Sequence, residues 1–235
     1  MKQKKTLAAC LAVLATFGQA QAAMGDDPIL TMLMIDQFEY RSTDGPDPLV
    51  LEADAWIGKD LHKAWFKIDA EHVDGELEEL EVQALYSRAI APFWDVQVGL
   101  RHDAKPEPDQ TWAAFGVKGL APYWFEVDAA AFVNEDAQVN VRLTAEYEWM
   151  FTQKLALSPE VEVNLYSKDD PARDIGAGLA DMQAGLRLRY EIKREFAPYI
   201  GVNWNHKFGE TEDLARAAGE TVDDVQFVVG VRAWF

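Results

Sequence analysis

Two methionines and an aspartate near the start of the chain have the types and spacing of metal ligands. Met32, Met34 and Asp36 alternate with Leu33 and Ile35, so their side chains share one face if this segment is an extended strand. Thioethers are soft ligands that suit Cu(I), while carboxylate and imidazole suit Cu(II). Methionines on a strand also serve simply to fill space, and this interpretation stays open beside the metal site.

Acidic side chains and histidines extend the set of candidate metal ligands. His72, His102 and His206 fall at segment ends that we expect to share the outer rim of the fold. Glu52 and Asp54 are two apart and belong to a series of acids in three successive segments, which continues with Asp69, Glu71, Glu79 and Glu81. These acids could bind a cation, or they could be solvated side chains paired with arginines.

A hydrolase is a separate possibility. His102 precedes Asp103, and a histidine with a carboxylate beside it can act as a general base. The chain contains no HExxH, CxxC, Gly-rich phosphate loop or GxSxG sequence. Because no ordered set of Ser, His and Asp partners accompanies the pair, the sequence favours a protein that is not an enzyme.

Segments of alternating residues must position these side chains. The last segment, 225–235, has an apolar residue at every second position, and most of the residues between them are small, polar or basic. Similar patterns recur along the chain with turn residues between them. The alternating segments are 30–41, 49–58, 62–72, 77–88, 94–103, 111–119, 124–133, 139–148, 155–166, 181–192, 199–208 and 225–235.

Two features favour a membrane barrel over a soluble β-sandwich, which would also alternate. Short connections that contain aromatic residues or proline alternate along the chain with longer acidic connections. Charged residues such as Asp69 and Arg142 recur near the middles of segments, where a cation facing lipid would cost roughly 2–4 kcal/mol. We therefore predict an all-β fold, a transmembrane antiparallel up-and-down β-barrel of about 12 strands with short periplasmic turns and longer acidic outer loops.

The N-terminal region predicts export. Residues 1–6 carry three lysines, an apolar run follows, and Ala20-Gln21-Ala22 supplies a small-residue cleavage pattern. The apolar run is too short to cross a bilayer as a helix. The predicted organisation is a cleaved signal peptide at 1–23, a short periplasmic lead-in at 24–29 and the barrel at 30–235.

Cysteine content and charge narrow the class further. Cys10 could belong to a lipoprotein acylation box, but little apolar sequence precedes it, and as the only cysteine it leaves with the signal peptide. The formal charge of −18 argues against nucleic acid as a partner and favours cations. These features predict a protein of the outer membrane of a Gram-negative bacterium, in contact with outer-membrane lipid.

Several long runs resemble the outer-membrane copper resistance protein B family, and the resemblance extends from about residue 26 to the end of the chain. Family members often carry a segment rich in Met and His before the barrel, whereas here Met24-Gly25-Asp26-Asp27-Pro28 leads almost directly into the first strand. The runs that carry the resemblance are Leu33-Met34-Ile35-Asp36-Gln37-Phe38-Glu39-Tyr40-Arg41, Leu85-Tyr86-Ser87-Arg88-Ala89-Ile90-Ala91-Pro92-Phe93-Trp94-Asp95, Gly119-Leu120-Ala121-Pro122-Tyr123, Glu195-Phe196-Ala197-Pro198-Tyr199-Ile200-Gly201-Val202 and Gly230-Val231-Arg232-Ala233-Trp234-Phe235.

This resemblance implies an outer-membrane copper resistance protein that binds copper ions, as Cu+ or Cu2+, or mediates their passage across the outer membrane. It also implies a periplasmic copper-handling protein as partner. From the residues, we expect a narrow lumen in which acids attract the cation and Met32, Met34 or a rim histidine supplies a ligand. A barrel hydrolase and a structural or adhesive barrel acting through its acidic loops are the alternatives.

Overall fold

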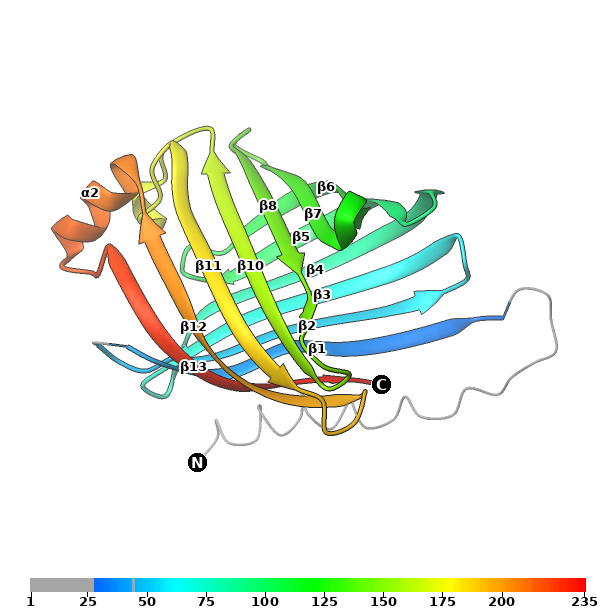
Figure 1. Ribbon diagram of the computed structural model, residues 1–235. Coiled ribbons are helices and arrows are strands. Elements are labelled where there is room, and N and C mark those ends of the chain that lie inside the picture. The colour runs from blue at the N-terminus through cyan, green and yellow to red at the C-terminus, as the bar shows by residue number, and fades with distance from the viewer. Residues whose placement is uncertain (1–27, 44) are drawn as a thin grey trace, which may run out of the picture.

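The computed structural model describes residues 28–43 and 45–235, which form one closed antiparallel sheet (Figure 1). The strands are β1 (Leu30–Ser42), β2 (Leu49–Gly58), β3 (His62–Val73), β4 (Glu76–Ala91), β5 (Trp94–Lys105), β6 (Gln110–Ala121), β7 (Phe125–Asn134), β8 (Val139–Tyr147), β9 (Trp149–Met150), β10 (Leu155–Tyr166), β11 (Gly178–Tyr190), β12 (Phe196–Lys207) and β13 (Asp223–Trp234). Among the described residues, twelve strands follow chain order around the ring, and β9 is a short extra strand paired with β10. Pairing of β13 with β1 closes the barrel, so the predicted architecture is confirmed.

The outward face of the sheet is apolar because the alternation places large hydrophobic side chains there. On β13, Val225, Phe227 and Val229 are 67%, 54% and 52% exposed, whereas the side chain of Val228 between them is fully buried. Such a surface is stable when lipid covers it, and the closed ring satisfies the backbone groups inside the hydrocarbon layer. No helix in the described part of the chain is long and apolar enough to cross a bilayer.

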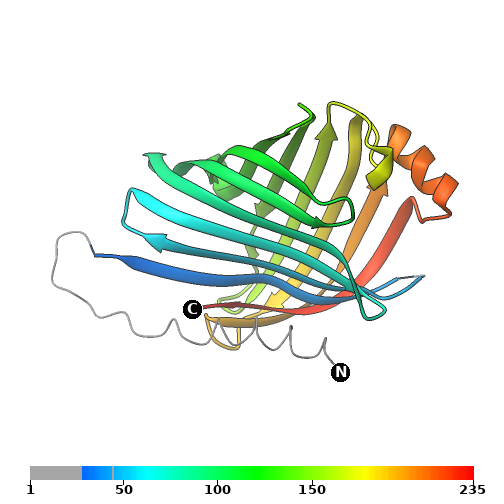
Figure 2. The same cartoon turned by 180° about the vertical axis from the view of Figure 1, so that it is seen from behind.

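The two ends of the barrel differ in their connections (Figures 1 and 2). One end carries the C-terminus, the 3₁₀ turn η2 (Pro122–Trp124) and the short connections such as the one between β4 and β5; we call it the turn end. The other end carries the 3₁₀ turn η3 (Pro171–Arg173) and the helix α2 (Gly209–Ala218); we call it the loop end. In barrels of this type the short turns face the periplasm.

Helix α2 is a regular element of the loop end that the alternation does not predict. The sequence predicts 209–224 as an acidic loop, but its first ten residues form a helix that packs on the ends of β11 and β12. Thr211 and Ala215 are one turn apart in this helix, and their side chains are buried. The Thr211 hydroxyl accepts a hydrogen bond from the Gly176 amide at 2.8 Å. The helix ends at Gly219, which has the left-handed backbone conformation typical of a helix C-terminus.

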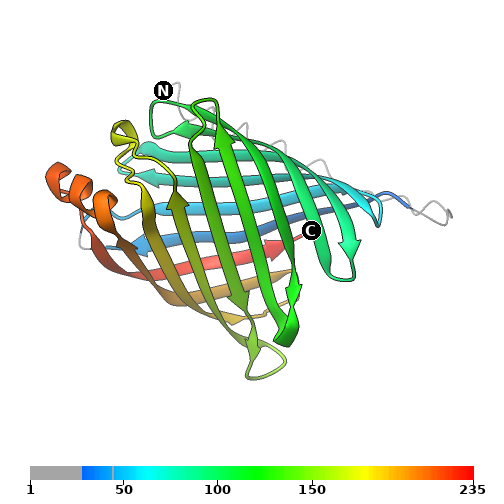
Figure 3. The same cartoon turned by 90° about the horizontal axis from the view of Figure 1, so that it is seen from above.

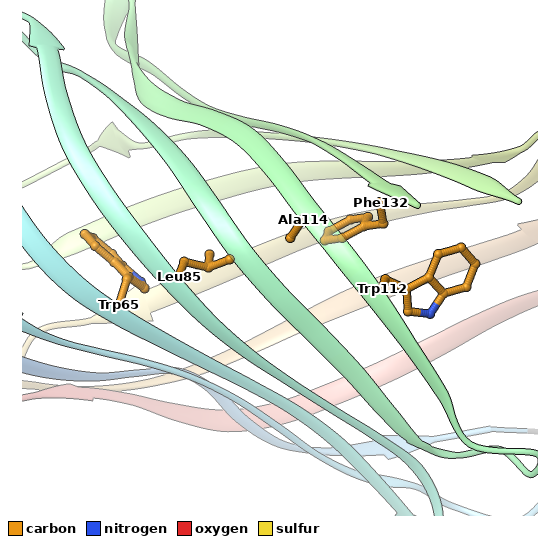
Figure 4. Packing of buried hydrophobic residues seen from close by; sticks show 5 residues of the cluster. All are labelled: Trp65, Leu85, Trp112, Ala114 and Phe132. Atoms are coloured by element: carbon orange, nitrogen blue, oxygen red, sulfur yellow. The ribbon is translucent and has the colours of Figure 1, made fainter. Parts of the chain in front are cut away.

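The interior of the barrel is filled by side chains, as expected for a small barrel. Figure 3 gives the view from above, and Figure 4 shows an apolar cluster made of Trp65, Leu85, Trp112, Ala114 and Phe132. The register places Trp65 of β3 opposite Leu85 of β4, and Ala114 of β6 opposite Phe132 of β7. This wall of the lumen is therefore apolar, while the charged side chains described below occupy the rest.

The N-terminal assignments remain predictions. The expected signal peptide at 1–23 lies outside the described residues, as does the expected lead-in at 24–29 apart from its last two residues. The first strand begins at Leu30.

Candidate functional site

Five of the eight candidate metal ligands line one cavity of about 520 Å³ in the lumen. They are Met32, Met34 and Asp36 of β1 with Glu52 and Asp54 of β2. The antiparallel register sets Met34 directly opposite Asp54, so a thioether and a carboxylate lie side by side on the inner face. The cavity therefore combines soft and hard metal ligands in one wall.

The carboxylates beside the methionines are paired with basic side chains. Arg232 of β13 lies 3.0 Å from Asp36 and 3.6 Å from Glu146, and its Nη2 donates to the Met34 sulfur at 3.7 Å. Lys118 of β6 lies 3.1 Å from Asp54. Nine carboxylate side chains and six basic side chains line the cavity altogether, so its wall has an excess of negative charge. Such a wall attracts cations but also holds its own counter-charges.

A β-bulge at Asp36 decides which residues of β1 face the lumen. Ile35 pairs with Ala53 and Gln37 pairs with Glu52, so Asp36 is the extra residue. Before the bulge the even-numbered residues point inward, and after it the odd-numbered ones do. Uninterrupted alternation along β1 does not predict the lumenal positions beyond the bulge, although polar residues at 37, 39 and 41 alternate there with Phe38 and Tyr40.

The three histidines lie at the loop end, where they are expected, but their side chains are on the outward face. His72 pairs with Leu49, which is itself exposed, and His102 shares its face with Leu100. His206 lies beyond Trp204 on the outer face of β12. The interpretation in which a rim histidine serves the lumen is therefore corrected, because the sheet itself separates all three imidazoles from the cavity.

The same alternation separates the two residues proposed for a hydrolase. His102 is exposed on the outer face, with Nδ1 3.0 Å from the Thr111 hydroxyl. Asp103 is buried on the inner face, where it accepts hydrogen bonds from arginines. Neighbouring residues of a strand point to opposite faces, so His102 and Asp103 cannot act as a pair.

Charged side chains from four elements join in the loop half of the lumen. Glu81 of β4 accepts from Arg142 of β8 at 2.9 and 3.0 Å and lies 2.8 Å from Arg101 of β5. Asp103 accepts from Arg101 at 2.6 and 2.9 Å and from Arg173 of η3 at 3.1 Å. We call these five residues the loop-end cluster. Since Arg173 comes from the connection between β10 and β11, that loop folds into the mouth of the barrel.

A second group of charged and polar side chains surrounds Arg187 of β11. Its guanidinium donates to Glu39 through two bonds of 2.9 Å, to Gln37 at 2.6 Å and to Glu160 at 3.0 Å. Arg41 donates to the same Glu39 carboxylate at 2.7 Å. We call these five residues the β1 cluster. It links β1 across the lumen to β10 and β11, and Tyr199 of β12 adds a hydrogen bond to Glu39 at 2.9 Å.

The β1 cluster stands between two cavities. A smaller cavity of about 40 Å³ lies beyond it and is lined by Arg41, Gln183 and Asn203 among others. The residues that line both cavities are Gln37, Glu52, Glu160, Glu162 and Arg187. The large cavity thus occupies the half of the lumen toward the turn end, where Phe93 and Leu120 belong to its wall.

The described residues contain no group of three or more His, Cys, Asp or Glu side chains arranged to hold a metal ion. A metal site in the cavity would therefore depend on the methionine sulfurs together with one or two carboxylates. Trp65 and Ser158 add two buried polar atoms to the cavity wall, Nε1 and Oγ, that have no hydrogen-bond partner among the described residues.

A closed antiparallel barrel with an apolar outer surface and an ion-paired lumen defines the protein as an outer-membrane β-barrel. Residues 29–235 match the family described as copper resistance protein B precursor (CopB), so the chain belongs to that family. It is 43% identical over 222 residues to copper resistance protein B of Escherichia coli, a match that covers 94% of this chain and 75% of the relative. It is 42% identical over 210 residues to a copper resistance protein B homolog of Pseudomonas syringae pv. tomato (strain ATCC BAA-871 / DC3000), with 89% and 71% covered.

Solved structures share the fold at low sequence identity. The NanC porin superposes with a TM-score of 0.57 at 10% identity, covering 87% of this chain and 99% of the porin. The KdgM porin gives a TM-score of 0.50 at 11% identity, covering 88% and 99%. These likenesses concern the barrel architecture alone.

Proposed function

We propose that this barrel serves copper resistance by binding copper ions in the turn-end cavity and by letting them cross the outer membrane. One observation carries the proposal: Met32, Met34, Asp36, Glu52 and Asp54 converge on the wall of a single lumenal cavity. Thioethers favour Cu(I) and carboxylates accept Cu(II), so the wall suits either oxidation state. The relatives named for copper resistance support the choice of metal.

Copper binding at this wall must displace basic side chains. Arg232 donates a hydrogen bond to the Met34 sulfur and forms an ion pair with Asp36, and Lys118 forms an ion pair with Asp54. An incoming cation takes over these carboxylates while the guanidinium and the ammonium move away from it, since like charges repel. The neighbouring acids, such as Glu126 and Glu146 in the same cavity wall, can receive the displaced cations.

Passage of copper requires the filled part of the lumen to open. The β1 cluster and the loop-end cluster lie between the large cavity and the loop end, and both depend on arginine–carboxylate pairs that a cation can compete for. The turn end is where a periplasmic copper-handling protein would exchange the ion, because the cavity wall reaches the turn residues Phe93 and Leu120 there. The outer surface of the barrel is in contact with outer-membrane lipid.

The proposed role involves no catalytic step. The hydrolase alternative required His102 and Asp103 to act together as a general base, but the two residues lie on opposite faces of β5. A structural or adhesive barrel stays as the competing class. This class predicts that copper does not bind the protein and that the copper tolerance of the cell does not depend on it.

Copper binding by the refolded mature barrel tests the proposal, with Cu(I) and Cu(II) measured separately in competition with a chelator. The test variant is Met32→Leu/Met34→Leu, which removes both sulfurs and preserves side-chain volume. We expect its lumenal Cu(I) affinity to fall by about tenfold or more, with a smaller change for Cu(II). Met150→Leu, at an exposed position of β9, is the matched control and should bind as the wild type does. Equal Cu(I) affinities in all three proteins would contradict the lumenal site.

A further inference from the structure

The three loop-end histidines have different neighbours on the outward face of the sheet. The register places His72 between two leucines and His102 between a valine and Thr111. His206 is placed instead between Met182 of β11 and Asp223 of β13. A thioether, an imidazole and a carboxylate therefore lie side by side on three adjacent strands, although they are far apart in the sequence.

Hydrogen bonds determine which ring nitrogen of His206 is available to bind a metal ion. Its Nδ1 lies 3.0 Å from Oδ2 of Asp223, and the other oxygen of this carboxylate accepts a bond from Trp204 Nε1 at 3.1 Å. A carboxylate can only accept, so the proton belongs on Nδ1 and the lone pair on Nε2. A carboxylate behind a histidine in this way is the usual support of a metal-binding imidazole.

Aromatic rings hold the imidazole of His206 in place. Trp204 stacks on it with ring centroids 5.6 Å apart, and Phe208 meets it edge-on at 4.5 Å. Directly opposed residues on neighbouring strands have Cβ atoms about 4.5–5.5 Å apart, so the Met182 sulfur can reach an ion bound at Nε2. The site is partly open, since the His206 side chain is 24% exposed.

We propose that Met182 and His206 form a copper-capture site on the outside of the loop end, with Asp223 as the residue that positions the imidazole. The inference rests on the proposed copper function but concerns a second place on the molecule, separated from the lumenal cavity by the sheet. Thioether sulfur and imidazole nitrogen together favour Cu(I), and solvent completes the coordination. Copper gathered there is concentrated beside the mouth through which it would enter or leave the barrel.

Copper titration of the refolded barrel with single substitutions tests the site. We expect His206→Ala to abolish one equivalent of bound copper, and Met182→Leu to weaken Cu(I) binding more than Cu(II) binding. Asp223→Asn should lower the affinity of that equivalent by about 10–100-fold, as the loss of a carboxylate behind a metal-binding histidine does. His102→Ala is the matched control, because its imidazole has neither a thioether nor a carboxylate beside it. Heat-modified electrophoretic mobility confirms that each variant is folded.

The outcome is separable from that of the lumenal site. Copper lost only in Met32→Leu/Met34→Leu, with His206→Ala unchanged, would overturn the capture site and leave the proposed function intact. Copper lost only in His206→Ala would support the capture site and contradict the lumenal one. If His206→Ala and His102→Ala lose the same amount, the binding is a general property of rim histidines and the proposal is wrong.

Discussion

At the scale of single residues, Arg232 has the most consequence for metal binding. One guanidinium contacts the Met34 sulfur, the Asp36 carboxylate and Glu146, so it occupies two of the candidate ligands at once. An arginine remains charged at any pH that the protein meets. The arginine therefore neutralises the candidate ligands while copper is absent, and its positive charge repels a copper ion that enters the cavity.

Arg232→Gln should consequently tighten lumenal copper binding. The substitution removes the competing charge from Met34 and Asp36, and relief of like-charge repulsion at close range is worth about 1 kcal/mol or more, which is about a fivefold gain in affinity. Competition with a chelator for Cu(I) and Cu(II) measures it. Lys63→Gln is the control, because Lys63 pairs with Asp95 at 3.0 Å and is not among the residues that line the cavity. Unchanged or weaker binding in Arg232→Gln would show that copper does not use these ligands.

At the scale of elements, the loop-end cluster ties β4, β5 and β8 together inside the barrel. The Glu81 side chain is 2% exposed and neutralises both Arg101 and Arg142. Removing one member of a buried ion pair leaves an uncompensated charge, which costs more than the pair itself contributes.

Glu81→Gln should lower the free energy of unfolding by about 3 kcal/mol. Urea unfolding of the barrel in lipid vesicles, followed by tryptophan fluorescence, measures the change. Glu107→Gln, which breaks an exposed pair with Lys105 in the loop end, should be indistinguishable from the wild type. Equal stability of the two variants would mean that Arg101 and Arg142 are sufficiently neutralised by Asp103, Glu162 and Asp69.

The strands themselves could be predicted closely from the sequence, and the reason is visible in particular segments. In β3 and β13 most residues at every second position are apolar and most of those between them are small, polar or charged, because one face meets lipid and the other the lumen. The prediction failed where alternation alone is insufficient. Asp36 adds a residue to β1 and so exchanges its two faces, and α2 follows a different periodicity inside a loop predicted as irregular.

The candidate site was predictable only in part, for a related reason. Period-two spacing correctly groups Met32, Met34 and Asp36 on one face, and Glu52 with Asp54 on another strand. Which strands become neighbours across the closure is a property of the whole ring, so the contact of Arg232 with Met34 has no local signal. The pairing of His206 with Met182 and Asp223 likewise depends on register between strands, which spacing within one strand does not determine.

At the scale of the whole molecule, the lumen is divided along its length. The turn half holds a cavity of about 520 Å³, the loop half is filled by the loop-end cluster, and the β1 cluster lies where the large cavity meets the smaller one. In this arrangement an ion can enter the cavity from the turn end but meets a barrier of paired charges beyond it. A barrel built in this way should conduct poorly until an arginine of the barrier moves.

Arg187→Ala should raise the ion conductance of the barrel in planar bilayers several-fold and make it more selective for cations. Arg187 holds Glu39, Glu160 and Gln37 together, and its loss both widens the passage and leaves the carboxylates as the local charge. Arg189→Ala is the matched control: Arg189 is two residues further along β11, but it pairs with Glu146 and Glu148 toward the turn end.

The conductance comparison also locates the barrier. Glu39 keeps hydrogen bonds from Arg41 and Tyr199 in the Arg187→Ala variant, so the cluster loses its cross-lumen link without leaving a buried carboxylate alone. If conductance rises in Arg187→Ala and stays low in Arg189→Ala, the β1 cluster is the barrier between the two cavities. If neither variant conducts more than the wild type while both are folded, the barrier is the loop-end cluster, and Glu81, Arg101 and Arg142 become the residues whose separation must accompany copper passage.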